Sequence, residues 1–372
     1  MQDSRIKILA RQVVNFSVSL KKGEKLLIDA MDGAEDFALA LVEAVYDAGG
    51  VPFVTLQTNR LNRALMLKGT EELWSEWYKY QSIRMKDMDA YIVIRRNDNP
   101  AELSDVPSDK LELYNRYYGK LHFGIRLPET KWCVLRYPNS AMAQAAGMSL
   151  EAFEDYYFKT CCVDYAKMNI AVTPLADLIS KTDQVRIIAP GTDITFSVKG
   201  LCDKTPKCGV YNIPCGEIGM PVITDSVNGV ISYNTPSLFQ GFVYQDIKFH
   251  FENGIIVKAE SNNTKRMNEV LDTDENARKI GEFALGFNPF VTRPILDTLF
   301  DEKMVKSLHF TPGNSKINPS GIHWDIVQSH DAKDGGGEIY FDGVMVRKDG
   351  LFVLKELEHI NPENLIQFIS LE

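Results

Sequence analysis

The first half of the chain alternates between two spacings of apolar residues. Apolar side chains recur at helical spacing in residues 6–16, 35–48 and 70–86. Between and after these segments stand short apolar runs that are typical of strands, namely KLLIDA, VPFVTL, AYIVIRR and KWCVLRYP. Strands separated by segments of helix length indicate crossover connections. The first half therefore predicts an α/β domain with a mostly parallel sheet.

The pattern changes near residue 185. Short strand-like segments joined by Gly and Asn turns follow, and EIYFDGVMVRKDGLFVL contains hairpin turns at Asp342-Gly343 and Asp349-Gly350. Asp274 to Gly286 is predicted as a helix, because acidic residues fill its first turn and Asn288-Pro289 follows its end. The sequence thus predicts two domains, an α/β N-terminal domain over 1–185 and a strand-rich, mixed α+β domain over 186–372.

Composition and charge exclude several classes of function. The net charge is −9 and no cluster of Lys and Arg suggests a phosphate track, which argues against a nucleic-acid partner. The start MQDSRIKILARQVV lacks the apolar core of a signal peptide, and no segment approaches membrane-spanning length. The six cysteines lack the spacing of a zinc knuckle or a disulfide framework. We expect a cytoplasmic protein with reduced thiols and no membrane partner.

GIHWDIV, residues 321–327, contains a histidine and an aspartate in a run that predicts a buried strand. Because strand side chains alternate between faces, His323 and Asp325 share one face of this segment. An isolated pair of this kind more often makes hydrogen bonds than binds a metal. His309, where a predicted strand runs into a Pro-Gly turn, adds a second imidazole.

Two glutamates stand in apolar surroundings. Glu217 lies in a Gly/Pro-rich loop, IPCGEIGMP, and Glu282 lies in the predicted helix, within KIGEFALGFNP. A buried carboxylate must be paired or must coordinate a metal, and ion pairing explains each glutamate taken alone. With His309, His323 and Asp325 they form a set of three carboxylates and two imidazoles. Such a set exceeds what one catalytic zinc needs and suits a pair of divalent ions.

Several segments resemble the metal-dependent aminopeptidases of peptidase family M29, among them LRYPNSAMAQAAGMSLEAFEDYYF, PGTDITFSVKG, GEFALGFNP and IHWD. The order and spacing of five residues match the family's metal ligands: Glu217, Glu282, His309, His323 and Asp325. The resemblance implies that the C-terminal domain binds two divalent ions (Zn, Co or Mn). It also implies a homodimer that removes N-terminal amino acids from short peptides. Glu282 is predicted to act in catalysis as well as in metal binding.

This chain departs from the family pattern in three places. The residues after Glu217 differ, the stretch between the two histidine ligands is shorter, and Lys316 stands where the family has a tyrosine. Lys316 either stabilises the tetrahedral intermediate through its charge or is solvated on the shortened loop. Both interpretations stay open.

Two rival functions also stay open. His309, His323 and Asp325 alone would form the two-histidine, one-carboxylate face of a non-haem Fe(II) enzyme, and a ring-cleaving dioxygenase of hydroxypyridines resembles the same family. The second rival is a non-catalytic relative. Glu217 and Glu282 favour the aminopeptidase, because a single-iron oxygenase has no need for them.

Overall fold

The computed structural model describes residues 3–202 and 205–370, which form two compact units. Unit 1 contains the residues up to Cys162 together with Gly209–Ile213, and unit 2 contains Val163–Cys208 and the residues from Pro214 onward. The helix α9 (Tyr165–Ile179) therefore belongs to the second compact unit. The division into domains at residue 185 stays a prediction.

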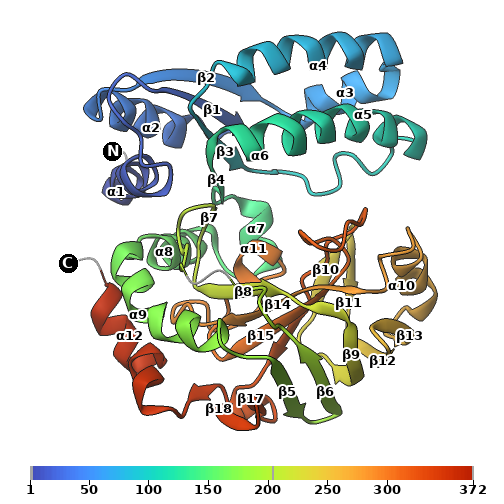
Figure 1. The fold of residues 1–372 in the computed structure, drawn as a ribbon. Helices are drawn as coiled ribbons and strands as arrows, with labels where there is room; N and C mark the ends of the chain where they lie inside the picture. Colours follow the sequence, from blue (N-terminus) through green and yellow to red (C-terminus); the bar gives the residue numbers. More distant parts are fainter. Residues whose placement is uncertain (1–2, 203–204, 371–372) are drawn as a thin grey trace. The chain divides into compact units, whose positions relative to one another are not determined.

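Unit 1 has a parallel sheet in the order β2-β1-β3-β4-β7. Its strands are β1 (Lys25–Met31), β2 (Val51–Gln57), β3 (Ala90–Arg95), β4 (Lys131–Arg136) and β7 (Asn212–Ile213). Its helices are α1 (Ser4–Gln12), α2 (Glu35–Asp47), α3 (Asn59–Lys68), α4 (Glu71–Lys86), α5 (Ser108–Leu121), α6 (Leu127–Glu129), α7 (Ser140–Ala145) and α8 (Leu150–Cys161), with π-helical turns at Val13–Ser17 and His122–Arg126. The helices α4, in light blue, and α5, in teal, lie side by side (Figure 1). The predicted α/β fold of this part is confirmed.

Unit 2 is rich in antiparallel strands. Its large sheet has the order β13-β12-β9-β6-β5-β17-β18-β19, and a smaller sheet has the order β16-β15-β14-β8. The strands of the large sheet are β5 (Gln184–Ala189), β6 (Thr192–Ser197), β9 (Ile223–Ser232), β12 (Lys248–Glu252), β13 (Ile255–Glu260), β17 (Glu338–Phe341), β18 (Val344–Lys348) and β19 (Leu351–Phe352). Those of the small sheet are β8 (Glu217–Pro221), β14 (Ile280–Gly286), β15 (Ser307–Pro312) and β16 (Val327–Ser329). The hairpin β10 (Ser237–Phe239) and β11 (Phe242–Tyr244) stands apart.

Helices cover part of unit 2. They are α9, α10 (Thr264–Leu271), α11 (Thr298–Asp301) and α12 (Pro362–Ile369), with 3-10 turns at Ala332–Asp334 and Lys355–Ile360. Although α9 and α12 are far apart in the sequence, they pack side by side, in green and red (Figure 1). No helix in the described ranges has both the length and the apolar character that crossing a bilayer demands. The predicted strand-rich second half is confirmed.

Aromatic side chains join the two sheets of unit 2. The ring of Phe196 on β6 lies 5.0 Å from that of Phe283 on β14 and 4.8 Å from that of Phe310 on β15. All three residues are fully buried. One face of the small sheet therefore belongs to the core, and the residues that alternate with Phe283 and Phe310 point to its other face.

The helix predicted over Asp274 to Gly286 is wrong, because Ile280–Gly286 is strand β14. This strand lies between two neighbours and is buried on both faces, so its apolar run is continuous and carries no strand periodicity. Gly281 favours the strand pairing: a Cβ at this position would lie 2.4 Å from the carbonyl oxygen of Gly313. The acidic residues at the start of the segment begin a turn, in which Asp274 accepts a hydrogen bond from the Asn276 amide.

Of the other local predictions, some are confirmed and some are wrong. The two hairpin turns are confirmed: Asp342 and Asp349 have φ of 48° and 49°, and each is followed by a glycine with positive φ. Glu217, predicted in a loop, is the first residue of β8. The regular strand of GIHWDIV begins only at Val327, although His323 pairs with Gly313 in an isolated bridge. The six cysteines form no disulfide with one another.

Candidate metal centre

Strands β8, β14 and β15 bring three predicted ligands to one face of the small sheet. The register pairs Ala284 of β14 with Gly219 of β8 on one side and with His309 of β15 on the other. Glu217 and Glu282 lie two residues from that row on their own strands, so both share the face of His309. This is the face opposite Phe283 and Phe310, and the small side chains of the row leave room for the two carboxylates.

Glycine at position 219 leaves room for the Glu282 side chain. A Cβ added at residue 219 would lie 2.2 Å from Glu282 Oε1. The Glu282 carboxylate therefore lies across the backbone of β8, while its other oxygen, Oε2, lies 3.9 Å from His323 Nε2.

His323 and Asp325 reach the same site from the extended segment before β16. His323 Nε2 lies 3.1 Å from Asp325 Oδ1, and His323 Nδ1 lies 2.8 Å from the carbonyl oxygen of Asn314. Because a carbonyl only accepts, Nδ1 carries a proton and Nε2 faces the carboxylates, which is the arrangement of a metal-binding histidine. Thr311 Oγ1 donates to Asp325 Oδ1 at 2.8 Å and fixes this carboxylate.

The charges of this group are strongly coupled. Burial works against the charged imidazole, but the carboxylates of Asp325 and Glu282 outweigh it and raise the pKa of His323 to about 10. Burial opposes the ionisation of Asp325 too, yet the imidazolium of His323 holds the pKa of Asp325 far below its usual value. Burial raises the pKa of Glu282, and the carboxylates of Glu217 and Asp325 add to that effect.

Glu217 and His309 form the other part of the site. Glu217 Oε2 lies 3.7 Å from His309 Nε2. Both Glu217 Oε2 and His309 Nδ1 are buried and lack a hydrogen-bond partner among the described residues. Buried polar atoms are rarely left unpaired, so the Glu217 oxygen that faces His309 Nε2 is available to a ligand.

Two residues of the site were missed by the sequence analysis. Glu302 and Lys303 follow α11 directly, and both are buried. The ammonium of Lys303 binds the Glu217 carboxylate and lies 2.5 Å from Glu302 Oε1, and Glu302 also shares a hydrogen bond with Asp325. A charged run such as DEK usually lies in solvent. The signal available in the sequence was its position between the apolar pairs LF and MV.

Burial dominates the electrostatics of this pair. Burial raises the pKa of Glu302 well above its ordinary value. Burial also disfavours the ammonium of Lys303, but the carboxylates of Glu217 and Glu302 outweigh it and raise the pKa of Lys303. Lys303 is thus a desolvated cation between two carboxyl groups, one of which belongs to the predicted metal ligand Glu217.

Lys316 is exposed in the loop that follows β15, and it makes no hydrogen bond or ion pair with any residue that the structure describes. Its backbone lies close in sequence to Asn314, whose carbonyl holds His323. The structure offers no contact in favour of a catalytic role for Lys316, and that role stays a prediction.

The donor types fit a divalent ion. Ligand atoms about 2.0–2.2 Å from one ion lie roughly 3–4 Å apart, and the distances from His323 Nε2 to Asp325 and Glu282 fall in that span. Within the described ranges, no group of three or more His, Cys, Asp or Glu side chains forms a ready-made metal site. In the metal-free protein the His323 proton and the Lys303 ammonium lie among the carboxylates, and an ion must displace that proton to bind to His323.

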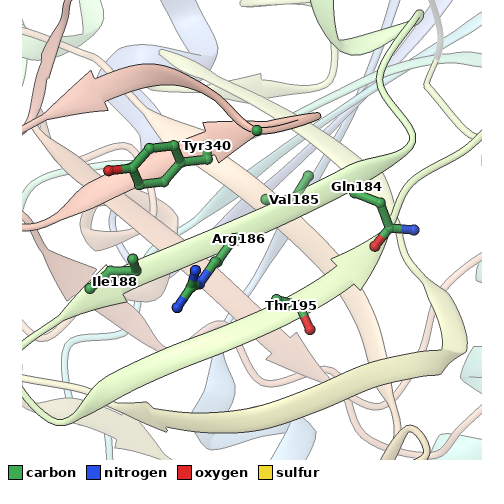
Figure 2. A pocket seen from close by; sticks show the side chains of 7 residues that line it. Gln184, Val185, Arg186, Ile188, Thr195 and Tyr340 are labelled. Carbon is green, nitrogen blue, oxygen red and sulfur yellow. The ribbon is translucent and has the colours of Figure 1, made fainter.

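A hollow on the surface of unit 2 lies apart from these residues in the fold. It is lined by Gln184, Val185, Arg186, Ile188, Thr195, Tyr340 and Gly343 (Figure 2). Arg186 is the most polar of them, and its guanidinium already binds both oxygens of Asp193, at 2.9 and 2.8 Å. None of the candidate ligands lines this hollow.

Comparisons with known proteins identify the family of this chain. Residues 2–350 match the sequence profile of a family described as thermophilic metalloproteases (M29). Aminopeptidase T of Thermus aquaticus is 24% identical over 353 residues, which cover 84% of this chain and 86% of that protein. Aminopeptidase AmpS of Bacillus subtilis is also 24% identical, over 80% of this chain and 82% of that protein.

Two solved structures share the fold. Wild-type AmpT from Thermus thermophilus has a TM-score of 0.79 at 21% identity, and the match covers 94% of this chain and 99% of that one. A 2,5-dihydroxypyridine dioxygenase from Pseudomonas putida KT2440 has a TM-score of 0.60 at 10% identity, over 95% of this chain and 99% of that one. At these identities the structural likeness shows the fold alone.

Proposed function

This chain belongs to the M29 family of thermophilic metalloproteases and is a metalloaminopeptidase, and we propose that it releases single N-terminal amino acids from short peptides by metal-assisted hydrolysis. The observation that carries the proposal is the convergence of Glu282, His323 and Asp325. His323 Nε2 faces both carboxylates while its Nδ1–H is held by the carbonyl of Asn314. Three protein ligands with an open position are the usual equipment of a catalytic metal site.

The proposed metal ligands form two groups. Glu282, His323 and Asp325 would hold one divalent ion, which, when bound, would acidify a water and polarise the scissile carbonyl. Glu217 and His309 lie 3.7 Å apart on β8 and β15, and they are the donors that the resemblance to the family implies for a second ion. Imidazole and carboxylate donors suit Zn, Co or Mn.

Glu282 has the position to move a proton. Its Oε2 faces His323, whereas its Oε1 lies across Gly219 on the other side of the carboxyl group. One oxygen can therefore bind the ion while the other takes the proton from the attacking water and returns it to the leaving amine. Thr311 and Glu302 keep the Asp325 carboxylate in place during this transfer.

The preference for a peptide N-terminus is part of the proposal, because relatives that match over most of the chain are named aminopeptidases. Short peptides as substrates and a homodimer are further parts of the proposal, and both come from the resemblance to the family.

Trimming of a mixed library of short peptides tests this function. Metal-stripped protein is supplied with Zn²⁺, Co²⁺ or Mn²⁺, and the products are followed by mass spectrometry beside the same peptides with acetylated N-termini. We expect metal-dependent loss of single N-terminal residues from the free peptides alone. If none of the three metals supports trimming, and the Fe²⁺ form cleaves the ring of a dihydroxypyridine with dioxygen, the protein is an oxygenase and the proposed function is wrong.

A further inference from the structure

The charge distribution around the site is uneven, and Lys303 is the cause. Its side chain is fully buried, and its ammonium lies between the carboxylates of Glu217 and Glu302. Glu217 and Lys303 are 86 residues apart in the sequence, so this contact exists only in the fold. A positive charge is therefore built into the protein beside one of the two groups of metal ligands.

The two groups of ligands also differ in completeness. Around His323 Nε2, two carboxylates lie within 3.9 Å, and the opposite ring nitrogen and the Asp325 carboxylate are both held by hydrogen bonds. Around His309, the one carboxylate in ion-pair range is that of Glu217, at 3.7 Å, among the described residues. The other oxygen of Glu217 is bound to Lys303.

We propose that the Lys303 ammonium supplies the positive charge that a second metal ion would otherwise bring, so that each chain binds one divalent ion tightly, at Glu282, His323 and Asp325. This inference rests on the proposed function, because it takes its ligands from there. An ion that shared the Glu217 carboxylate with Lys303 would be repelled by the ammonium in a buried region of low dielectric constant. The ammonium is also tied to Glu302, which hinders its displacement.

Lys303 is thus a residue that determines how many ions bind. Among the described residues, Lys303 forms no ion pair with the ligands Glu282 or His323. Its charge therefore does not compete with the ion that these ligands would bind. The fixed charge also keeps the Glu217 carboxylate in one orientation, with Oε2 turned toward His309. The chain thus keeps all five predicted ligands, but the Lys303 ammonium stands in place of one of the two ions.

The number of bound ions tests the inference directly. The full-length protein, stripped and then dialysed against a series of Zn²⁺ or Mn²⁺ concentrations, is analysed for metal per chain, and the Mn²⁺ form is examined by EPR. We expect one tight ion per chain and an EPR signal of isolated Mn²⁺. Two ions of similar affinity, with the signal of a coupled pair, would overturn the proposal.

The variant Lys303→Met tests the cause. With the ammonium gone, a second ion should bind about tenfold or more tightly than in the unmodified chain, the scale of effects from residues around metal ligands. Lys258→Met is the matched control, since Lys258 also pairs with a glutamate, at 2.9 Å, but lies exposed on β13. A second ion that binds no better to Lys303→Met than to the control would contradict the assigned role.

Removing Lys303 alone leaves buried carboxylates unpaired and can prevent folding. The double variant Glu302→Gln/Lys303→Met removes the ion pair as a neutral unit, and it should also gain the second ion. Peptide trimming is measured on the same samples. One tight ion per chain without trimming would support the inference and refute the proposed function. Two tight ions per chain with trimming would support the proposed function and refute the inference.

Discussion

Single residues decide how close the candidate ligands can come to one another. Gly219 stands opposite Ala284, and Ala284 stands opposite His309, so the row between the glutamates carries little side-chain volume. A larger residue at position 219 would meet the end of the flexible Glu282 side chain and not a backbone atom. The fold can adapt to such a change, but only by moving a ligand.

We therefore expect Gly219→Ala to keep the fold and to weaken metal binding. The added Cβ would stand 2.2 Å from Glu282 Oε1 and force this carboxylate away from His323. Metal affinity should fall by about tenfold or more, on the scale of changes around metal ligands. Titration with Zn²⁺ and a thermal melt measure the two effects. Gly124→Ala is the control, because a Cβ there meets nothing within 4 Å; equal metal loss in both variants would contradict the prediction.

His323→Ala should remove the tight ion and the peptidase activity together. The imidazole supplies the one nitrogen donor that faces both Asp325 and Glu282. Metal analysis after dialysis and the peptide-trimming assay measure the loss. His250→Ala is the matched control, since His250 pairs with Glu260 on the large sheet and is not a predicted ligand. Full metal content and full turnover in His323→Ala would show that His323 is not a metal ligand.

At the scale of elements, one buried cation joins the strands that carry the ligands. Arg347 of β18 donates to the carbonyl oxygens of Gly286 at the end of β14, Ser307 at the start of β15, and Gly350, at 3.0, 2.7 and 2.9 Å. Burial lowers the pKa of Arg347 to about 9. The guanidinium thus connects the two sheets of unit 2 at the ends of β14 and β15.

Arg347→Met should destabilise unit 2 by roughly 3–5 kcal/mol. Three buried carbonyl groups lose their donor, and each unsatisfied group costs about 1–3 kcal/mol, partly offset by relaxation. Chemical denaturation followed by fluorescence gives the change in the free energy of unfolding. The exposed Arg186, whose solvent-screened pair with Asp193 contributes little to stability, provides the control variant Arg186→Met. Equal losses in the two variants would show that the Arg347 hydrogen bonds do not stabilise the fold.

At the scale of the whole molecule, both units contain a histidine that the fold keeps neutral. Burial, reinforced by nearby arginines, lowers the pKa of His122 in unit 1 to about 4 and that of His330 in unit 2 to about 3. The His330 ring contacts Gln328 and leaves no room for a side chain at Gly337, where a Cβ would lie 2.7 Å from the ring. The GGG segment is thus a turn packed against this ring.

These histidines predict a loss of stability in acid. Their pKa values are depressed in the folded state, so between about pH 6.5 and pH 3 the unfolded chain binds more protons. The stabilisation is complete above pH 6.5 and declines as the pH falls, by up to about 1.4 kcal/mol per pH unit for each histidine. Urea unfolding at several pH values measures this slope, which should be shallower in His330→Gln. An unchanged slope in that variant would mean that His330 takes up its proton without unfolding.

The sequence by itself determined the fold class, and with the resemblance to the family it predicted which residues are metal ligands. Alternation along 321–327 placed His323 and Asp325 on one side, and their recorded separation of 3.1 Å agrees with that placement. Turn residues predicted the Asp-Gly hairpins, because positive φ at two adjacent positions leaves few residue choices. These features depend on local backbone geometry, which neighbouring residues set.

Only the tertiary structure decided what surrounds the ligands. The segment of β14 was predicted as a helix, because a strand that is buried on both faces shows no alternation of apolar and polar residues. The sequence did not single out Lys303, and its burial between Glu217 and Glu302 follows from contacts between distant segments. The charge beside a metal ligand is a long-range property of the fold, because Coulomb energy depends on distance in space and on burial, and neither is written in the order of the residues.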